Sequence, residues 1–218
     1  MQKFVVVDLD GTLLNTLPDI AGAMNRVLNR FGLPGHPEES FKRFTGNGAR
    51  KLCERALGSR QDMLEIVYPA YLSEYAQNST LDTHPYKGVP ELIRSLTVEG
   101  FALIVYSNKD DPEAKGVVPH YFPDIAFLDV VGSLPDVPLK PDPTALLHLL
   151  AQHKLDSKYG VYLGDTVMDI RCAKAACLYA VAAGWGFQPE EMLLAEKPDR
   201  LIQKPDQLLG IIRERSKL

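Results

Sequence analysis

Short apolar runs that do not alternate with polar residues are the feature that most constrains the fold of this chain. They lie at Phe4 to Val7, Phe101 to Tyr106, Ile125 to Val131, Val161 to Leu163 and Tyr179 to Ala183. Such runs are typical of strands buried on both faces, as in a parallel sheet covered by helices. Helical patterns lie between most of them, for example over residues 89–96 and after Asp142-Pro143. The alternation predicts an α/β fold with a doubly wound, Rossmann-like parallel sheet.

The stretch from about residue 16 to residue 82 interrupts this alternation. It contains no convincing strand, and its apolar residues predict helices near 20–31, 49–57 and 63–75. A crossover between parallel strands needs only about a dozen residues or somewhat more. We therefore expect an inserted α-helical cap domain at 16–82 and an α/β core (catalytic) domain made of 1–15 and 83–218. The turn-rich segment 82–88 would form the return hinge.

Composition and charge exclude several classes of function. Of the 218 residues 45% are hydrophobic and 24% are charged, which is ordinary for a soluble globular protein. The net charge of -4, without a basic run, argues against a nucleic-acid partner. No apolar run approaches the roughly 18 residues of a membrane span, and no signal peptide is recognisable. We therefore expect no membrane partner and a cytoplasmic protein, in which the three cysteines are incidental thiols.

Acidic residues follow two of the predicted strands. Asp8 and Asp10 come directly after the first apolar run, and Asp165 and Asp169 come after the run that ends at Leu163. Ligands of open α/β sheets bind at the carboxyl ends of the strands. Clustered carboxylates need a cation or a shared proton, and their oxygens suit magnesium. Taken alone, each motif is also compatible with a solvated turn or, at Asp169, with a helix capping box.

Two further motifs lie where phosphate could be bound. The run ending at Tyr106 leads into Ser107 and Asn108, whose hydroxyl and backbone amides could donate to phosphate oxygens. Lys140 lies in a proline-containing loop before a predicted helix and could place an ammonium beside a phosphate. Individually these motifs would be a plain turn and an exposed lysine. In combination with the two acidic pairs they supply a nucleophile, a proton donor, phosphate ligands and a metal site.

This set of motifs closely resembles the haloacid dehalogenase-like (HAD) hydrolase superfamily over essentially the whole chain. The matching residues are Asp8-Leu9-Asp10-Gly11-Thr12, Ser107-Asn108, Lys140, and Gly164-Asp165 with Asp169. Within the superfamily the chain looks most like the phosphoglycolate phosphatase branch. That likeness rests on the stretches 46–49, 85–89 and 185–187.

The resemblance implies a magnesium-dependent phosphatase that works through an aspartyl phosphate. Asp8 would be the nucleophile, and Asp10 would act as general acid and then as general base. Mg²⁺ would be held by Asp8, the backbone carbonyl of Asp10 and Asp165, with Asp169 binding it directly or through water. The phosphoryl oxygens would be held by a hydroxyl, an amide and an ammonium, namely those of Ser107, Asn108 and Lys140.

For phosphoglycolate, the substrate carboxylate also needs a cation near the cleft between cap and core. Arg50 is the predicted candidate because it follows the glycine-containing turn at 46–49. Arg43 and Lys51 are alternatives, and a solvated surface arginine is a further interpretation.

The expected partner is thus a small phosphorylated metabolite, handled by a monomer or a homodimer. Alternatives within the superfamily are a sugar phosphomutase and a pyrophosphatase. A non-catalytic phosphate-binding regulatory module is an alternative of another class, against which the intact pair of Asp8 and Asp10 argues. A dehalogenase is disfavoured because both Asp165 and Asp169 are present.

Overall fold

A six-stranded sheet lies at the centre of the larger part of the molecule in the computed structural model, which describes residues 2–215. In spatial order its strands are β5 (Asp129–Ser133), β4 (Ala102–Asp110), β1 (Phe4–Val7), β6 (Gly160–Gly164), β7 (Tyr179–Ala183) and β8 (Arg200–Ile202). All five pairings are parallel. The fold class predicted from the sequence is confirmed.

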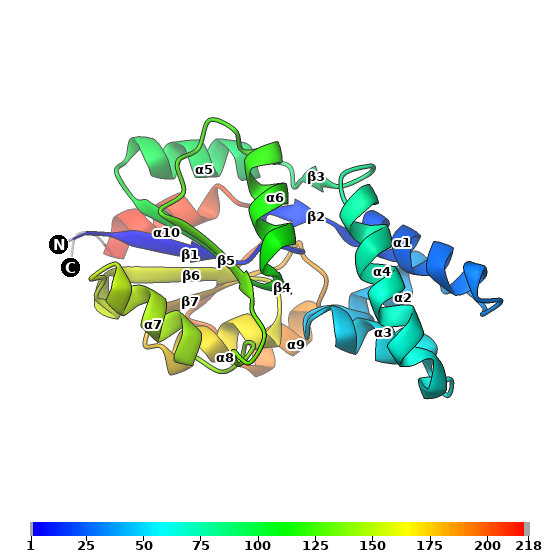
Figure 1. Cartoon of the computed structure of the whole chain (residues 1–218). Helices are drawn as coiled ribbons and strands as arrows, with labels where there is room; N and C mark the ends of the chain where they lie inside the picture. The colour runs from blue at the N-terminus through cyan, green and yellow to red at the C-terminus, as the bar shows by residue number, and fades with distance from the viewer. Residues whose placement is uncertain (1, 216–218) are drawn as a thin grey trace.

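Helices cover both faces of this sheet (Figure 1). They are α5 (Val89–Val98), α6 (Asp111–Tyr121), α7 (Thr144–Gln152), α8 (Val167–Ala175), α9 (Glu190–Ala195) and α10 (Gln207–Arg215). Because side chains alternate along a strand, Val5 and Val7 of β1 pack toward α5, α6 and α10. Phe4 and Val6 pack on the other face, toward α7 and α8. With both faces buried, β1 could only be an unbroken apolar run.

A helical unit, defined here as residues 17–78, lies beside the sheet rather than on it (Figure 1). It consists of α1 (Leu17–Arg30), α2 (Glu38–Phe44), α3 (Ala49–Leu57) and α4 (Leu64–Asn78). These helices share their own hydrophobic cluster, in which Met24, Phe41 and Val67 are fully buried. Two short antiparallel strands, β2 (Leu14–Asn15) and β3 (His84–Pro85), carry the chain in and out. Short 3-10 turns lie at Gln61–Met63 and Ser157–Tyr159.

Several element bounds differ from the sequence-based expectation. The strand predicted at 125–131 begins only at Asp129, because Ile125 and Phe127 pack against the core from the preceding turn. Strand β4 continues past Tyr106 to Asp110. Helix α2 and strand β8 were not predicted, since each contributes a single buried residue, Phe41 and Ile202, and so leaves little periodic signal.

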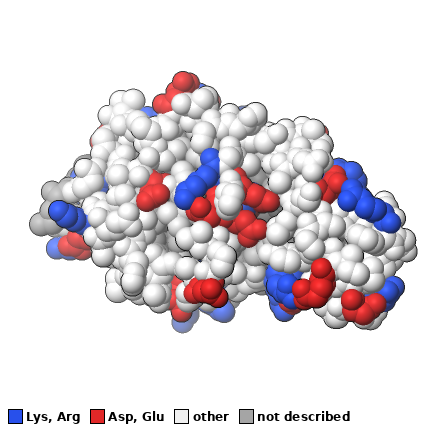
Figure 2. All heavy atoms as spheres, in the orientation of Figure 1, with Lys and Arg blue, Asp and Glu red and all other residues white. Residues whose placement is uncertain are grey.

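The surface adds two observations. None of the helices within residues 2–215 is both long enough and apolar enough to cross a lipid bilayer. On the face drawn in Figure 2, acidic side chains gather near the middle of the molecule, over the place where Figure 1 shows the lower end of α6. This end of α6 lies at the boundary between the sheet and the helical unit.

Candidate active site

Three aspartates meet at the carboxyl ends of β1 and β6. The parallel register pairs Val7 with Leu163, and the Asp8 amide donates to the Leu163 carbonyl at 2.9 Å. Carboxylate oxygens of Asp8, Asp165 and Asp169 all lie within 4.8 Å of one another. The three residues are no more than 5% exposed. The structure thus brings the early and late acids of the sequence together in one buried cluster.

Glycines make the close approach around Asp165 possible. Gly11 has a φ of +85°, and a Cβ atom on it would lie 2.3 Å from Asp165 Oδ2. A Cβ atom on Gly186 would lie 2.2 Å from the Cβ of Asp165. Any larger residue at either position would have to displace the carboxylate or the backbone.

Asp165 lies in this cluster without a cation of its own. Its two oxygens accept hydrogen bonds from the Thr12 hydroxyl and the Phe187 amide, both at 2.7 Å. Within the described part of the chain no lysine or arginine pairs with it. Burial, reinforced by the charges of Asp8 and Asp169, raises the pKa of Asp165 well above its usual value. A divalent cation bound here would remove that repulsion, and carboxylate oxygens are the ligands that Mg²⁺ prefers.

Lys140 is buried between two acids of the cluster. Its Nζ lies 2.8 Å from Asp8 Oδ1 and 2.6 Å from Asp169 Oδ1, and the residue is only 3% exposed. Burial alone would lower the pKa of Lys140, but Asp169 and Asp8 raise it above its ordinary value. Burial and the neighbouring Asp169 raise the pKa of Asp8 to about 7, although Lys140 opposes this. The alternative of an exposed loop lysine is wrong for Lys140.

Both carboxylate oxygens of Asp169 accept two hydrogen bonds each. Its Oδ1 accepts from Lys140 and from the Tyr162 hydroxyl, and its Oδ2 accepts from the amide and hydroxyl of Thr166. The Thr166 hydroxyl in turn accepts from the Asp169 amide at 3.3 Å, which completes a capping box at the start of α8. The capping interpretation of this motif is correct, and the same carboxylate also orients Lys140.

Ser107 and Asn108 lie at the end of the neighbouring strand, β4. The Ser107 hydroxyl faces the cavity described below and accepts from the Lys109 amide at 3.2 Å. The Asn108 side chain accepts from the Lys140 amide at 2.9 Å and donates to the carbonyls of Gly46 and Lys140. Asn108 therefore ties the Lys140 loop to the helical unit. A phosphate contact from Asn108 would have to come from its main chain.

Asp10 points away from the other acids and pairs with Lys109. Lys109 Nζ lies 3.1 Å from Asp10 Oδ1 and donates to the Tyr75 hydroxyl of α4 at 2.7 Å. Burial alone would lower the pKa of Lys109, but Asp10 and Tyr75 together raise it above its ordinary value. Sequence reasoning gave neither residue a role. Lys109 adjoins the Ser107-Asn108 motif and could have been found there, whereas nothing in the sequence singles out Tyr75.

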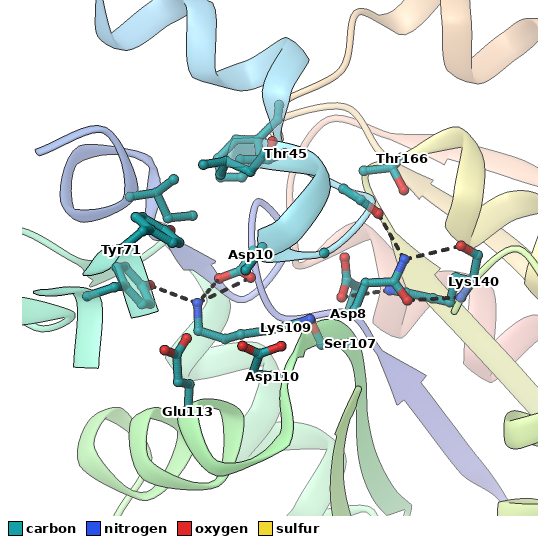
Figure 3. A pocket seen from close by; sticks show the side chains of 18 residues that line it. Asp8, Asp10, Thr45, Tyr71, Ser107, Lys109, Asp110, Glu113, Lys140 and Thr166 are labelled. Atoms are coloured by element: carbon teal, nitrogen blue, oxygen red, sulfur yellow. Dashed lines mark hydrogen bonds and ion pairs between the residues drawn. The ribbon is translucent and has the colours of Figure 1, made fainter. Parts of the chain in front are cut away.

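A cavity of about 60 Å³ lies between the strand ends and the helical unit (Figure 3). Core residues on its wall include Asp8, Asp10, Ser107, Asn108, Lys109, Asp110, Glu113, Lys140, Thr166 and Phe187. The helical unit contributes Ile20, Thr45, Gly46, Gly48, Ala49, Leu52, Tyr71 and Tyr75. The nucleophile, proton donor and phosphate ligands predicted from the sequence thus border one cavity.

Arg50 lies outside this space. Its side chain is 48% exposed, pairs with Glu65 and lies over the Tyr68 ring at 5.5 Å from the centroid. Lys51 pairs with Glu54 on the surface, and Arg43 is exposed as well. None of these three cations lines the cavity, so the geometry gives no support to the predicted carboxylate-binding role of Arg50.

Comparisons with known proteins agree with the fold. The family model described as haloacid dehalogenase-like hydrolase matches residues 5–183. A phosphoglycolate phosphatase from Mannheimia succiniciproducens is 32% identical, with 96% of this chain and 98% of the relative covered. One from Vibrio parahaemolyticus is 28% identical, with 96% of each chain covered.

Solved structures show the same likeness. A structure from Haemophilus somnus, described as a predicted phosphoglycolate phosphatase, has a TM-score of 0.89 at 28% identity and covers 96% of this chain and 97% of its own. The family-model match covers most of the chain, including the acids that follow β1 and β6. The chain therefore belongs to the haloacid dehalogenase-like hydrolase family.

Proposed function

We propose that the chain is a phosphomonoesterase that transfers the phosphoryl group of a small substrate to Asp8 and then to water. The observation that carries the proposal is the buried cluster of Asp8, Asp165, Asp169 and Lys140, with Asp10 bordering the same cavity. Phosphoryl transfer depends mainly on positioning and on stabilising negative charge. This cluster supplies both at the end of the central strand.

The donor set fits a magnesium ion. Asp8 and Asp165 offer carboxylate oxygens that lie within 4.8 Å of one another, and both residues are buried. Mg²⁺ would be held by these two residues and by the Asp10 carbonyl. Because four hydrogen bonds already engage the Asp169 carboxylate, we expect Asp169 to reach the ion through water. Bound there, the ion would neutralise charge on the phosphoryl oxygens.

The two aspartates that follow β1 divide the chemistry between them. An oxygen of Asp8 bonds to phosphorus while the bond to the ester oxygen breaks, and Asp10 gives its proton to that leaving oxygen. Asp10 then takes a proton from water as the water oxygen attacks the aspartyl phosphate, which releases phosphate and restores Asp8. Lys140 and Ser107 border the place where the transferred oxygens would lie.

The helical unit would act as a cap that excludes bulk water. It touches the catalytic loops directly, through Tyr75 on Lys109 and through the Gly46 carbonyl on Asn108. Such lids commonly open for exchange of substrate and product. The small cavity that remains suits a small leaving group better than a nucleotide.

Phosphoglycolate is the first substrate to assay, because relatives of this chain carry that substrate in their names. We would measure phosphate release from a panel of small phosphomonoesters, sugar phosphates and pyrophosphate, with Mg²⁺ and with a chelator. We expect ester hydrolysis that requires Mg²⁺ and falls at least about 1,000-fold in Asp8→Asn. Asp124→Asn, an exposed acid, is the matched control.

Two results would contradict the proposal. One is full activity of Asp8→Asn in a folded protein, and the other is hydrolysis that persists without any divalent ion. Transfer of phosphate between sugar hydroxyls, without net release, would instead indicate a phosphomutase.

A further inference from the structure

The end of the cavity farthest from the aspartate cluster is the place where a leaving group would lie. Figure 3 shows Lys109, Asp110 and Glu113 on its core side and Tyr71 on its cap side. Asp10, the proposed proton donor to the leaving oxygen, faces Lys109 here. The charges at this end therefore act on the part of the substrate that differs from one phosphomonoester to another.

Both cations on the cavity wall already have acidic partners. Lys109 is shared between Asp10 and the Tyr75 hydroxyl, and Lys140 is shared between Asp8 and Asp169. Among the lining residues that the structure describes, no arginine and no third lysine occurs. A substrate carboxylate would thus have to compete with Asp10 for Lys109.

Glu113, in contrast to the two lysines, has no such partner among the described residues. It lies in the first turn of α6 and is half-buried on the cavity wall. No hydrogen bond or ion pair from any other residue in the range 2–215 reaches its carboxylate. Burial raises the pKa of Glu113 to about 7, with Lys109 opposing and Asp110 and Asp10 contributing. An acid left without a partner here is ready to accept a hydrogen bond from a ligand.

The neighbouring acid shows what a purely structural role looks like. Asp111 also lies in the first turn of α6, where acids stabilise the helix dipole. Its oxygens accept from the Gly132 amide at 3.0 Å and from Lys115 at 2.7 Å. Acidic side chains gather on the surface over this end of α6 (Figure 2). The local excess of negative charge would act on any anionic leaving group.

We propose that Glu113 sets specificity, by accepting a hydrogen bond from an ammonium or hydroxyl group of the leaving group and disfavouring a carboxylate there. The inference rests on the proposed phosphatase activity and narrows its substrate class. The preferred substrates are small phosphomonoesters of amino alcohols and polyols. Phosphoglycolate would be a poor substrate of this chain, despite the names of its relatives.

The test uses three two-carbon esters that differ in one group: O-phosphoethanolamine, 2-hydroxyethyl phosphate and phosphoglycolate. For the wild-type protein we expect kcat/KM to be lowest for phosphoglycolate. In Glu113→Gln, the ratio of kcat/KM for phosphoglycolate to that for phosphoethanolamine should rise about tenfold, since a hydrogen bond to a charged group is lost and a like charge removed. Glu91→Gln, which removes an exposed acid of α5, should leave the ratio unchanged.

The outcomes separate this inference from the proposed function. A wild-type preference for phosphoglycolate, or an unchanged ratio in Glu113→Gln, would overturn the role of Glu113 while leaving the phosphatase in place. The wild-type preference needs no variant, so poor folding of Glu113→Gln does not block the test. Failure of the wild-type protein to release phosphate from all three esters and from p-nitrophenyl phosphate would overturn both.

Discussion

The two ends of the cavity are each built around a buried lysine, but they differ in how completely their acids are paired. At one end Lys140 bridges Asp8 and Asp169. At the other end Lys109 bridges Asp10 and the Tyr75 hydroxyl, while no hydrogen bond or ion pair from the described residues reaches Glu113. The charged groups of the first end all come from the core, whereas the second end also includes Tyr75 of α4 in the helical unit.

In the proposed function, this difference separates the groups that transfer the phosphoryl group from the groups that recognise the leaving group. The end around Lys140 has its charges held by strand ends and by the capping box of α8, and the helical unit reaches it through the Gly46 carbonyl, which accepts from Asn108. The end around Lys109 is completed only when Tyr75 lies against the core. An enzyme built this way can keep one transfer reaction and change its leaving group through a few residues.

The largest effect on activity is expected at Asp165, which has no lysine or arginine partner among the described residues. Asp165→Asn should lower activity roughly 100-fold or more, because it removes a ligand of the proposed Mg²⁺ site. The same change should raise the melting temperature of the metal-free protein, since it relieves repulsion from Asp8 and Asp169. Activity assays measure the first effect, and thermal unfolding with a chelator measures the second. The same unfolding measurement with Mg²⁺ gives the stabilisation by the ion. Stabilisation by Mg²⁺ that is equal in variant and wild type would contradict the assignment.

A smaller loss of activity is expected from a change at Lys109, at the end of the cavity that includes Tyr75. Lys109→Met should lower kcat about tenfold on every ester, because Asp10 loses the partner that orients it beside the leaving oxygen. Lys109→Arg should recover part of the loss, and the exposed Lys204→Met should have no effect. If Lys109→Met raised KM alone and left kcat intact, Lys109 would bind substrate and not position Asp10.

Glu113 should also change how the stability of the folded protein depends on pH. The pKa of Glu113 is raised from 4.5 to about 7 in the folded protein, so between these values the folded state binds more protons than the unfolded state. Stability must then fall as pH rises through this window. Glu113→Gln stays neutral, so its melting temperature should gain on that of wild type between about pH 5 and about pH 8. An equal difference at both pH values would place Glu113 in solvent.

The smallest effect is expected at Arg50. Its ion pair with Glu65 is on the surface, where such pairs contribute little. Arg50→Ala should change kcat/KM for phosphoglycolate and for 2-hydroxyethyl phosphate by less than about twofold. A loss confined to phosphoglycolate would restore the role that the sequence suggested for Arg50 and would require the cap to move.

The residues at the Lys140 end of the cavity could be predicted from the sequence, because the buried strands that precede them can be recognised there. Asp8 and Asp165 directly follow buried strands, Ser107 lies in the last part of β4, and parallel strands bring their carboxyl ends to one edge. Lys140 was also found, although its burial between two acids was not. Its proline-containing loop looked like exposed surface, and only tertiary packing turns it inward.

The recognition end could not be predicted in the same way. Tyr75 lies in the last turns of α4, where its spacing predicts only a buried helix face. Glu113 looks like an ordinary first-turn acid of α6, indistinguishable from Asp111 by sequence. Arg50 follows a glycine turn, which suggests a place beside the cavity, yet the rotation of α3 directs it to solvent and to Glu65. The position of each of these three side chains relative to the cavity depends on how the helical unit docks against the core.

The central claim is that Asp8 accepts the phosphoryl group. The most direct measurement is to quench the enzyme rapidly during turnover with Mg²⁺, reduce the acyl phosphate with borohydride and locate the modified residue by peptide mass spectrometry. The account predicts conversion of Asp8 to homoserine, with no such product in the chelated enzyme. Reduction at another aspartate, or none under conditions where phosphate is being released, would contradict it.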